Sequence, residues 1–85
     1  MVCILLVEDD VQFNKIVCSY LSESGYNVVG CHSAAEALEQ MEKISFDMII
    51  SDIMMPKVDG YKLLENVRQL DKNIPFIFMT ANAIA

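Results

Sequence analysis

Acidic residues follow two apolar runs of this chain. Glu8-Asp9-Asp10 comes directly after the first run, and Ser51-Asp52 comes at the end of a later one. If the two runs are neighbouring strands of a parallel sheet, three or four carboxylates converge where the strands end. Because like charges repel, such a cluster requires either raised pKa values or a bound cation. Oxygen ligands of this kind suit Mg²⁺, which takes one or two carboxylates together with waters and phosphate oxygens.

Each of these acids has a simpler interpretation when it is taken alone. An acid that follows a strand often caps the next helix, and Asp10 is placed to do so before Val11. Lys57 is interpreted as a solvated residue, because a lysine beside a proline in a loop usually is one, although it could reach a bound phosphoryl group. His32 is interpreted as a surface residue, since nothing near it marks a phosphorylated histidine. Taken together at the ends of two apolar runs, however, the acids favour a functional cluster.

The elements that must position the acids are short apolar runs that alternate with helical patterns. The expected strands are residues 3–7, 26–31, 48–50 and 76–79. Three of them are continuously apolar, as is typical of parallel strands covered on both faces. The second carries Asn27 and Gly30 and is typical of an edge strand.

Three helical patterns lie between these strands. Gly25 is expected to end the first helix, Ser33 and Glu36 to form a capping box for the second, and Asp59 to cap the third. The first helix is expected to bury the stripe Phe13, Ile16, Val17, Tyr20 and Leu21. The third is expected to bury the stripe Leu63, Leu64, Val67 and Leu70. Right-handed crossovers then give an α/β fold, a parallel sheet with helices on both faces.

Composition excludes several classes of function. The chain has 85 residues and a net charge of −6, which argues against direct binding to nucleic acid or to an anionic membrane surface. The apolar stretch 2–7 lacks a preceding basic cluster and runs into acids, so it does not resemble a signal peptide, and a cytoplasmic location is expected. Cys3, Cys18 and Cys31 show no spacing typical of a disulfide framework or a zinc site.

Three segments resemble the receiver domain of two-component response regulators. Residues 4–10 resemble that family's first strand and acidic pair, and residues 46–56 with Asp59-Gly60 resemble the segment around its phosphorylated aspartate. Residues 74–81 resemble its fourth strand, which ends in a switch hydroxyl. The resemblance covers the whole chain, in order and at similar spacing.

The resemblance implies a role for each matching residue. Asp52 corresponds to the phosphoacceptor, and Glu8 and Asp9 correspond to acids that hold Mg²⁺. The backbone carbonyl of Met54 completes the metal site together with Asp52, and Thr80 supplies the switch hydroxyl. A carboxylate nucleophile forms an acyl phosphate, which fits these roles.

The resemblance also implies a flavodoxin-like doubly wound sheet of five strands in the order 2-1-3-4-5. Residues 1–85 are expected to form an incomplete domain of order 2-1-3-4, without the fifth strand and the last helices. The family's active-site lysine and switch aromatic are not matched by any residue. Pro56 and Gly60 are expected to shape the loop after Asp52, and Asn82 matches a position that tunes dephosphorylation in the family.

The expected function is therefore that of a regulatory phosphoacceptor rather than an enzyme. Its expected partners are a sensor histidine kinase or phosphotransfer protein, an output domain, and a second copy of the chain. The second copy is expected either to pair with the edge at residues 76–79 or to pack on the bare face of the sheet. A receiver-like interaction module that is not phosphorylated remains an alternative. A phosphoaspartyl hydrolase is disfavoured, because Glu8-Asp9-Asp10 does not supply that class's D-x-D. A flavin-binding fold is weaker still, since three acids repel an unmetallated phosphate.

Overall fold

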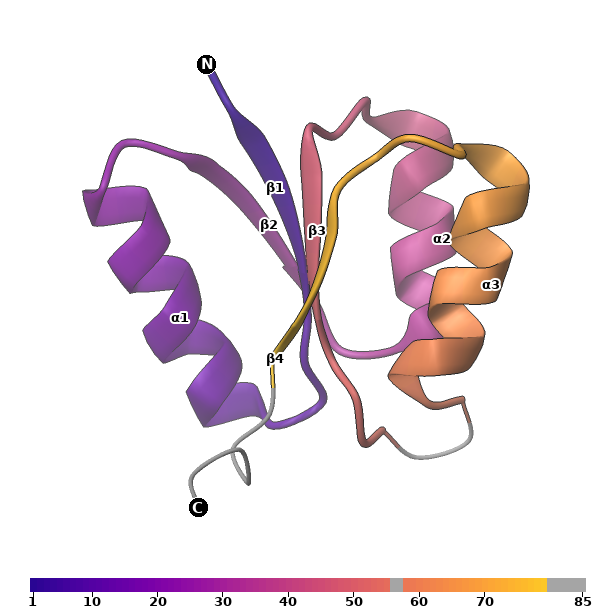
Figure 1. The fold of residues 1–85 in the computed structure, drawn as a ribbon. Coiled ribbons are helices and arrows are strands. Elements are labelled where there is room, and N and C mark those ends of the chain that lie inside the picture. Colours follow the sequence, from indigo (N-terminus) through magenta and orange to yellow (C-terminus); the bar gives the residue numbers. More distant parts are fainter. Residues whose placement is uncertain (56–57, 80–85) are drawn as a thin grey trace.

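A computed structural model describes residues 1–55 and 58–79 of the chain. Strands and helices alternate along it (Figure 1). Their order is β1 (Cys3–Val7), α1 (Val11–Glu23), β2 (Asn27–Cys31), α2 (Ala34–Lys43), β3 (Met48–Asp52), α3 (Gly60–Leu70) and β4 (Phe76–Met79). The predicted alternation is confirmed.

The strands form one parallel sheet in the order β2-β1-β3-β4. Helix α1 lies on one face of this sheet, and α2 and α3 lie on the other (Figure 1). Both the predicted α/β class and the predicted strand order are thereby confirmed. The central position of β1 explains its composition, because Leu5, Leu6 and Val7 are fully buried between the two helical layers.

The core lies between the sheet and the pair α2 and α3. Leu63 and Val67 of α3 meet Leu5 and Ile49 of the sheet there, and all four side chains are fully buried. Burying a side chain of this size contributes about 1.5–3 kcal/mol to folding. Leu70 was predicted to belong to this stripe, but it is 62% exposed, because it is the last residue of α3.

Helix α1 differs from its predicted packing. Val17 and Phe13 are half-buried, whereas Ile16 and Tyr20 are 64% and 69% exposed, so the predicted stripe is wrong at those two positions. The reason is that α1 contacts β2 and β1 only along one side, and no other described element covers its flank (Figure 1). The single fully buried residue of α1 is polar, Asn14.

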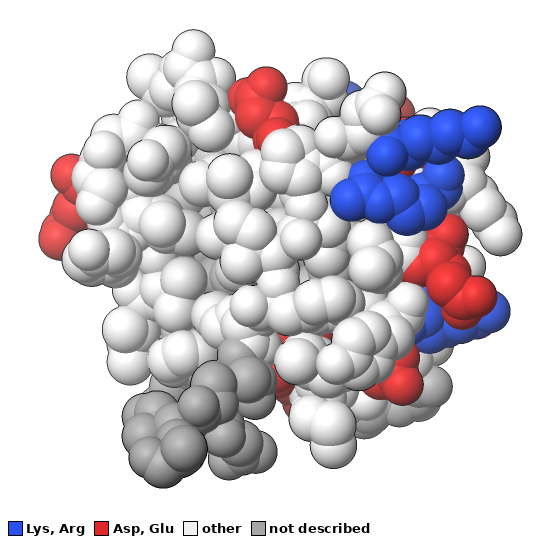
Figure 2. Space-filling view, viewed as in Figure 1, with Lys and Arg blue, Asp and Glu red and all other residues white. Residues whose placement is uncertain are grey.

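The surface beside α1 is largely uncharged. Figure 2 shows Lys, Arg, Asp and Glu mainly around the margin of this face, with uncharged side chains across its middle. Ile77 of β4, which is 47% exposed, contributes to the apolar surface of the molecule. Within the described residues β4 pairs with β3 and its other side has no strand partner, so it is an edge strand.

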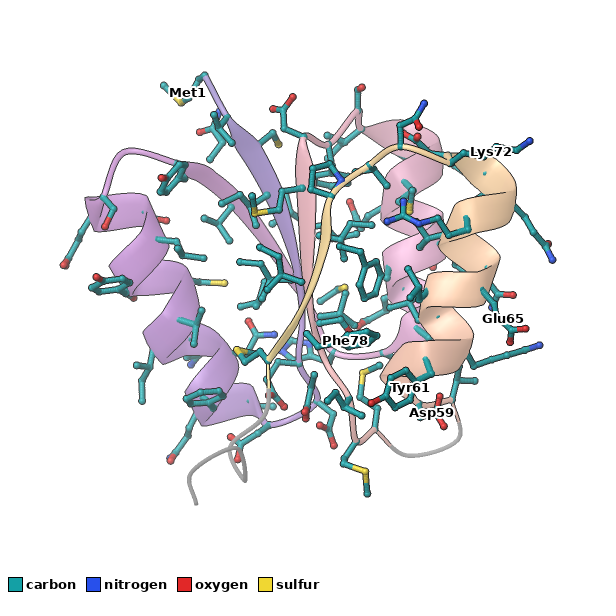
Figure 3. All side chains as sticks on the ribbon, viewed as in Figure 1. Met1, Asp59, Tyr61, Glu65, Lys72 and Phe78 are labelled. Atoms are coloured by element: carbon teal, nitrogen blue, oxygen red, sulfur yellow. The ribbon has the colours of Figure 1, made fainter. Side chains whose placement is uncertain are left out.

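Aromatic contacts hold β4 to α3. The rings of Tyr61 and Phe78 lie 4.9 Å apart between centroids, and Phe76 lies 5.2 Å from Phe78 (Figure 3). Such tilted pairs add about 0.5–1.5 kcal/mol beyond the area that they bury. The edge strand is therefore anchored on the α3 face, and its opposite face is the more open one.

The predicted helix ends are confirmed. The Asp10 side chain accepts a hydrogen bond from the Phe13 amide at 3.0 Å, and Asp59 accepts one from the Lys62 amide at 2.8 Å. Ser33 caps α2 by accepting from the Glu36 amide at 3.2 Å. Gly25 follows α1 with φ of +98°, a left-handed conformation that glycine adopts without strain.

None of the helices in the described part of the chain is long and apolar enough to cross a membrane.

Candidate metal centre at the carboxyl edge of the sheet

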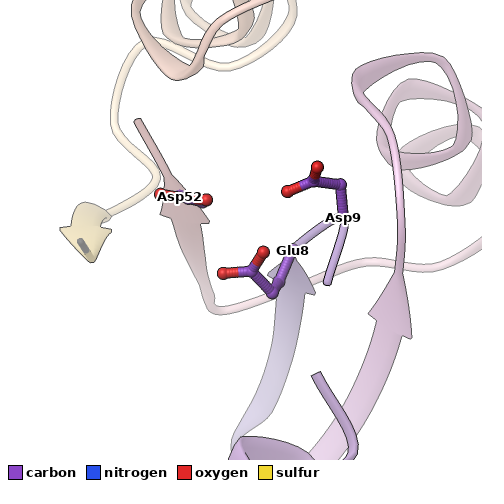
Figure 4. Close-up of side chains that lie close together, drawn as sticks. All are labelled: Glu8, Asp9 and Asp52. Atoms are coloured by element: carbon purple, nitrogen blue, oxygen red, sulfur yellow. The ribbon is translucent and has the colours of Figure 1, made fainter. Parts of the chain in front are cut away.

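The acids that follow β1 and β3 come together in the structure. Val7 and Ser51 are the last residues that pair between these two neighbouring strands, so Glu8 and Asp52 are the next residues of the two chain segments at the same edge of the sheet. Glu8, Asp9 and Asp52 each place a carboxylate oxygen within 4.8 Å of the others (Figure 4). The predicted convergence is confirmed for three acids, whereas Asp10 is used as the cap of α1.

Glu8 is the electrostatically unusual member of this acidic cluster, which we define as Glu8, Asp9 and Asp52. It is only 4% exposed, and its Oε2 accepts a hydrogen bond from the Asp10 amide at 2.9 Å. Burial raises the pKa of Glu8 to about 7, and the Asp9 and Asp52 carboxylates add to the shift, while the Asp10 amide opposes it. The cluster therefore concentrates negative charge at a cost that a bound cation would relieve.

The donor set fits a hard divalent cation. All three groups of the acidic cluster are carboxylates, and Mg²⁺ prefers oxygen ligands and binds through one or two carboxylates plus water. Cys31 does not compete for such a role, since burial raises the pKa of its thiol to about 12 and keeps it protonated. The residues present are thus suited to Mg²⁺ rather than to a thiolate-bound metal.

Asp52 forms hydrogen bonds with Ser51 of β3 and with Met54 of the loop that follows the strand. The Met54 amide lies 3.4 Å from Oδ1 of Asp52, and the Ser51 hydroxyl donates to the Asp52 carbonyl at 2.9 Å. Met54 is 69% exposed, and its contact with the cluster is made by its backbone amide. At the start of α3, the Gly60 amide donates to the Ile53 carbonyl at 2.7 Å.

Gly60 is needed where it stands because the backbone passes so close to it. A β-carbon at this position would collide with the carbonyl oxygen of Asp52 and lie 3.0 Å from Cα of Ile53. Only glycine allows α3 to begin this near to the phosphoacceptor candidate. The predicted loop-shaping role of Gly60 thus has a steric basis.

Several predicted positions lie outside the described residues. They are Pro56, Lys57, Thr80 and Asn82. His32 is exposed, as predicted, and its amide donates to Glu36 at 2.6 Å. Sequence reasoning missed Asn14, which touches the backbone of Glu8. A polar residue next to an apolar helix stripe was the signal that could have found it.

Comparisons with known proteins agree with this architecture. Residues 4–84 match the family model of the response regulator receiver domain. A probable transcriptional regulator, ycf29, of Porphyra purpurea is 45% identical over 83 residues, which cover 95% of this chain and 40% of that protein. The chain thus spans less than half the length of this curated relative.

Solved structures give the same result. The response regulator TrrA of Thermotoga maritima, in complex with Mg²⁺–BeF, superposes with a TM-score of 0.91 at 29% identity, over 98% of this chain and 72% of that one. A complex of the histidine kinase ThkA with TrrA matches with a TM-score of 0.90 at 28% identity, over 99% of this chain and 72% of that one. With its parallel sheet, its acidic cluster and these matches, the chain belongs to the family of response regulator receiver domains.

Proposed function

We propose that this receiver domain accepts a phosphoryl group on Asp52. The observation that carries the proposal is the acidic cluster, in which the Asp52 carboxylate lies within 4.8 Å of the carboxylates of Glu8 and Asp9 at the end of β3. The similar TrrA was solved with Mg²⁺–BeF, which supports a site for a cation and a phosphoryl-like group at this edge. The alternative of a module that is not phosphorylated has no comparable support.

The reaction that we propose is a transfer between two nucleophiles. A carboxylate oxygen of Asp52 attacks the phosphorus of a phosphohistidine, an O–P bond forms, and the N–P bond breaks with its electron pair returning to the imidazole. Mg²⁺, when bound, would neutralise the phosphoryl oxygens as they approach the acids. Glu8 and Asp9 would hold the cation, together with Asp52 and the backbone carbonyl of Met54.

Thr80 is proposed as the switch hydroxyl that donates to a phosphoryl oxygen. It follows Met79 in the sequence, and Met79 pairs with Asp52 in the β3–β4 register, which supports this role. Its own position lies outside the described residues. The proposed activity is regulatory, and any self-catalysed dephosphorylation is part of that proposal.

The proposed phosphoryl donor is a sensor histidine kinase or a phosphotransfer protein. The ThkA–TrrA complex supports a kinase as the partner of a similar domain.

An output domain is proposed because the chain spans 40% of a relative described as a probable transcriptional regulator. The net charge of −6 opposes direct binding of nucleic acid by these residues themselves. The cytoplasmic location and the incomplete domain, without a fifth strand, stay predictions.

Self-association of the 85-residue chain is a further part of the proposal. Its support is the edge strand β4, on which Ile77 is exposed, together with the exposed apolar side chains Ile16 and Tyr20 of α1. Unpaired strand edges and contiguous apolar surfaces are the features through which copies of a chain associate. A second copy is the proposed occupant of this surface.

A titration with beryllium fluoride tests the central proposal. In the presence of Mg²⁺, the wild-type chain should bind the fluoride complex and shift the NMR resonances of Asp52 and its neighbours. The Asp52→Asn variant, whose amide is a poor ligand for beryllium, should show no saturable shift. Equal binding by both proteins would contradict the assignment of Asp52 as the acceptor.

A further inference from the structure

Asn14 is the one buried residue of α1, and its side chain is polar. It is 4% exposed, whereas the other residues of the helix are half-buried or exposed. Burying an amide without partners costs roughly 1–3 kcal/mol in proteins, so its hydrogen bonds explain its place. Asn14 leaves no polar side-chain atom unsatisfied, within the residues that the structure describes.

The amide of Asn14 joins the ends of two strands. Its Nδ2 donates to the carbonyl oxygen of Glu8 at 3.0 Å and to the carbonyl oxygen of Cys31 at 2.9 Å. The paired register of β1 and β2 ends at Val7 and Cys31, and the Glu8 amide donates to the same Cys31 carbonyl at 3.0 Å. The Asn14 side chain therefore continues the backbone ladder by one step, at the point where the acidic loop leaves the sheet.

Two neighbours fix the orientation of this amide. The Cys18 thiol lies 3.4 Å from Oδ1 of Asn14 and donates to it. Gly30 of β2 provides the space, since a β-carbon there would lie 2.5 Å from Oδ1 and 2.8 Å from the sulfur of Cys18. Thus the glycine that weakens β2 as a strand is the residue that lets Asn14 reach the two carbonyls.

The Glu8 carbonyl belongs to the peptide bond that joins Glu8 to Asp9, the two acids proposed to hold the cation. Repulsion among the three carboxylates of the acidic cluster favours an outward movement of this peptide. A hydrogen bond from a buried donor opposes that movement, because breaking it would leave one N–H of the Asn14 amide without its acceptor, while the other still donates to Cys31. Asn14 is the side chain that supplies this restraint from α1.

We propose that Asn14 is a positioning residue for the acidic cluster, which it holds in a metal-binding arrangement through the Glu8 carbonyl. The inference rests on the proposed Mg²⁺ site, and Asn14 itself touches neither the cation nor the phosphoryl group. Replacing a residue that orients metal ligands through hydrogen bonds commonly weakens metal affinity by about 10–100-fold. Loss of the Asn14 amide should therefore weaken Mg²⁺ binding by about 10-fold.

The test is a Mg²⁺ titration of the 85-residue chain followed by NMR, with the Asp9 amide as the reporter, since this N–H belongs to the restrained peptide. Asn14→Leu keeps the approximate side-chain volume and removes both donors. Its Mg²⁺ dissociation constant should rise by about 10-fold. Asn14→Ser retains one hydroxyl donor, so its Mg²⁺ dissociation constant should lie between those of the wild type and Asn14→Leu. It serves as the measured variant if Asn14→Leu does not fold.

Two matched controls separate positioning from general stability. Val67→Ala opens a cavity in the core on the opposite face of the sheet, and it should lower stability while it leaves the Mg²⁺ dissociation constant unchanged. Cys18→Ala removes the contact to Oδ1 but keeps both Asn14 donors, so its Mg²⁺ affinity should stay close to that of the wild type. Wild-type affinity in a folded Asn14 variant would overturn the inference. An absence of saturable Mg²⁺ binding in the wild type would instead overturn the proposed function beneath it.

Discussion

The carboxylates of Glu8 and Asp52 lie within 4.8 Å of one another at the ends of two adjacent strands. Glu8 is buried and accepts a hydrogen bond from the backbone, whereas Asp52 is half-buried and held by the loop that follows it. These surroundings give the two acids different expected roles. Glu8 is suited to sharing a cation, and Asp52 to meeting an incoming phosphoryl group.

Phosphorylation should occur at Asp52 alone. Incubation of the chain with labelled acetyl phosphate and Mg²⁺ should add label that Asp52→Asn removes, because an amide cannot form the acyl phosphate. Asp59→Asn is a matched control, since Asp59 caps α3 and should leave labelling intact. Label that persists in Asp52→Asn would show that another residue is the acceptor.

Stability in metal-free buffer should fall as the pH rises from about 4.5 to about 7. The pKa of Glu8 is raised from 4.5 to about 7 in the folded chain, so between these values the folded state holds more protons than the unfolded state. Stability from the protonated Glu8 is therefore fully present at the acidic end of the window and lost at its neutral end. This loss amounts to about 3 kcal/mol.

Chemical denaturation across this pH range, with Glu8→Gln beside the wild type, provides the measurement. The variant cannot ionise at this position, so its free energy of unfolding should change less over the same window. Parallel curves for the two proteins would show that Glu8 titrates at its ordinary pKa.

Mg²⁺ should raise the melting temperature of the wild type, because a ligand that binds the folded state stabilises it by mass action. Asp9→Asn removes one of the repelling charges, so it should stabilise the metal-free chain and weaken the effect of Mg²⁺. Thermal unfolding with and without Mg²⁺ measures both effects. If Mg²⁺ raises the melting temperature of both proteins equally, the ion binds elsewhere.

Gly60→Ala should destabilise the chain by about 1–3 kcal/mol, because the new methyl group would collide with the Asp52 carbonyl. The same collision should displace the loop that carries Asp52 and lower its labelling by acetyl phosphate. Gly25→Ala is an informative comparison, since nothing lies within 4 Å of a β-carbon there and its cost comes from the left-handed backbone alone. A loss of labelling in Gly25→Ala equal to that in Gly60→Ala would contradict the steric argument.

Much of this fold could be predicted because the signals are local. The caps at Asp10, Ser33 and Asp59 depend on residues a few positions away, and all three are observed. The meeting of Glu8 with Asp52 could also be predicted, because strands that are parallel and adjacent end at the same edge. The positions of the acids after two apolar runs, together with this general property of parallel sheets, were therefore sufficient to predict the cluster.

Other features could not be predicted from local patterns. The helical period of α1 indicated that Ile16 and Tyr20 are apolar neighbours, but not whether another element covers them, and both are exposed. The role of Asn14, which lies on α1, depends on Cys31 and Gly30, which belong to β2. A hydrogen bond of this kind is visible only after the chain has folded.

The wild-type chain should self-associate through the exposed edge strand β4 or through the exposed apolar surface of the molecule. Ile77 lies in the middle of this edge strand and is 47% exposed, and no charged residue interrupts the strand Phe76–Met79. Ile77→Lys introduces a charge at the edge, which is a common way in which natural sheets prevent pairing. Sedimentation should show a concentration-dependent dimer or larger species for the wild type and a monomer for this variant.

A second variant identifies the surface that is used. Ile16→Lys places the same charge on α1, which is 64% exposed at this position and does not belong to the strand edge. If copies pair through β4, Ile16→Lys should still associate, whereas packing through the open face of the sheet should be weakened by both substitutions. Circular dichroism of each variant verifies that the helices and strands remain folded. A folded wild-type chain that stays monomeric at all concentrations would contradict the proposed association, because the exposed edge and apolar surface would then be tolerated without a partner copy.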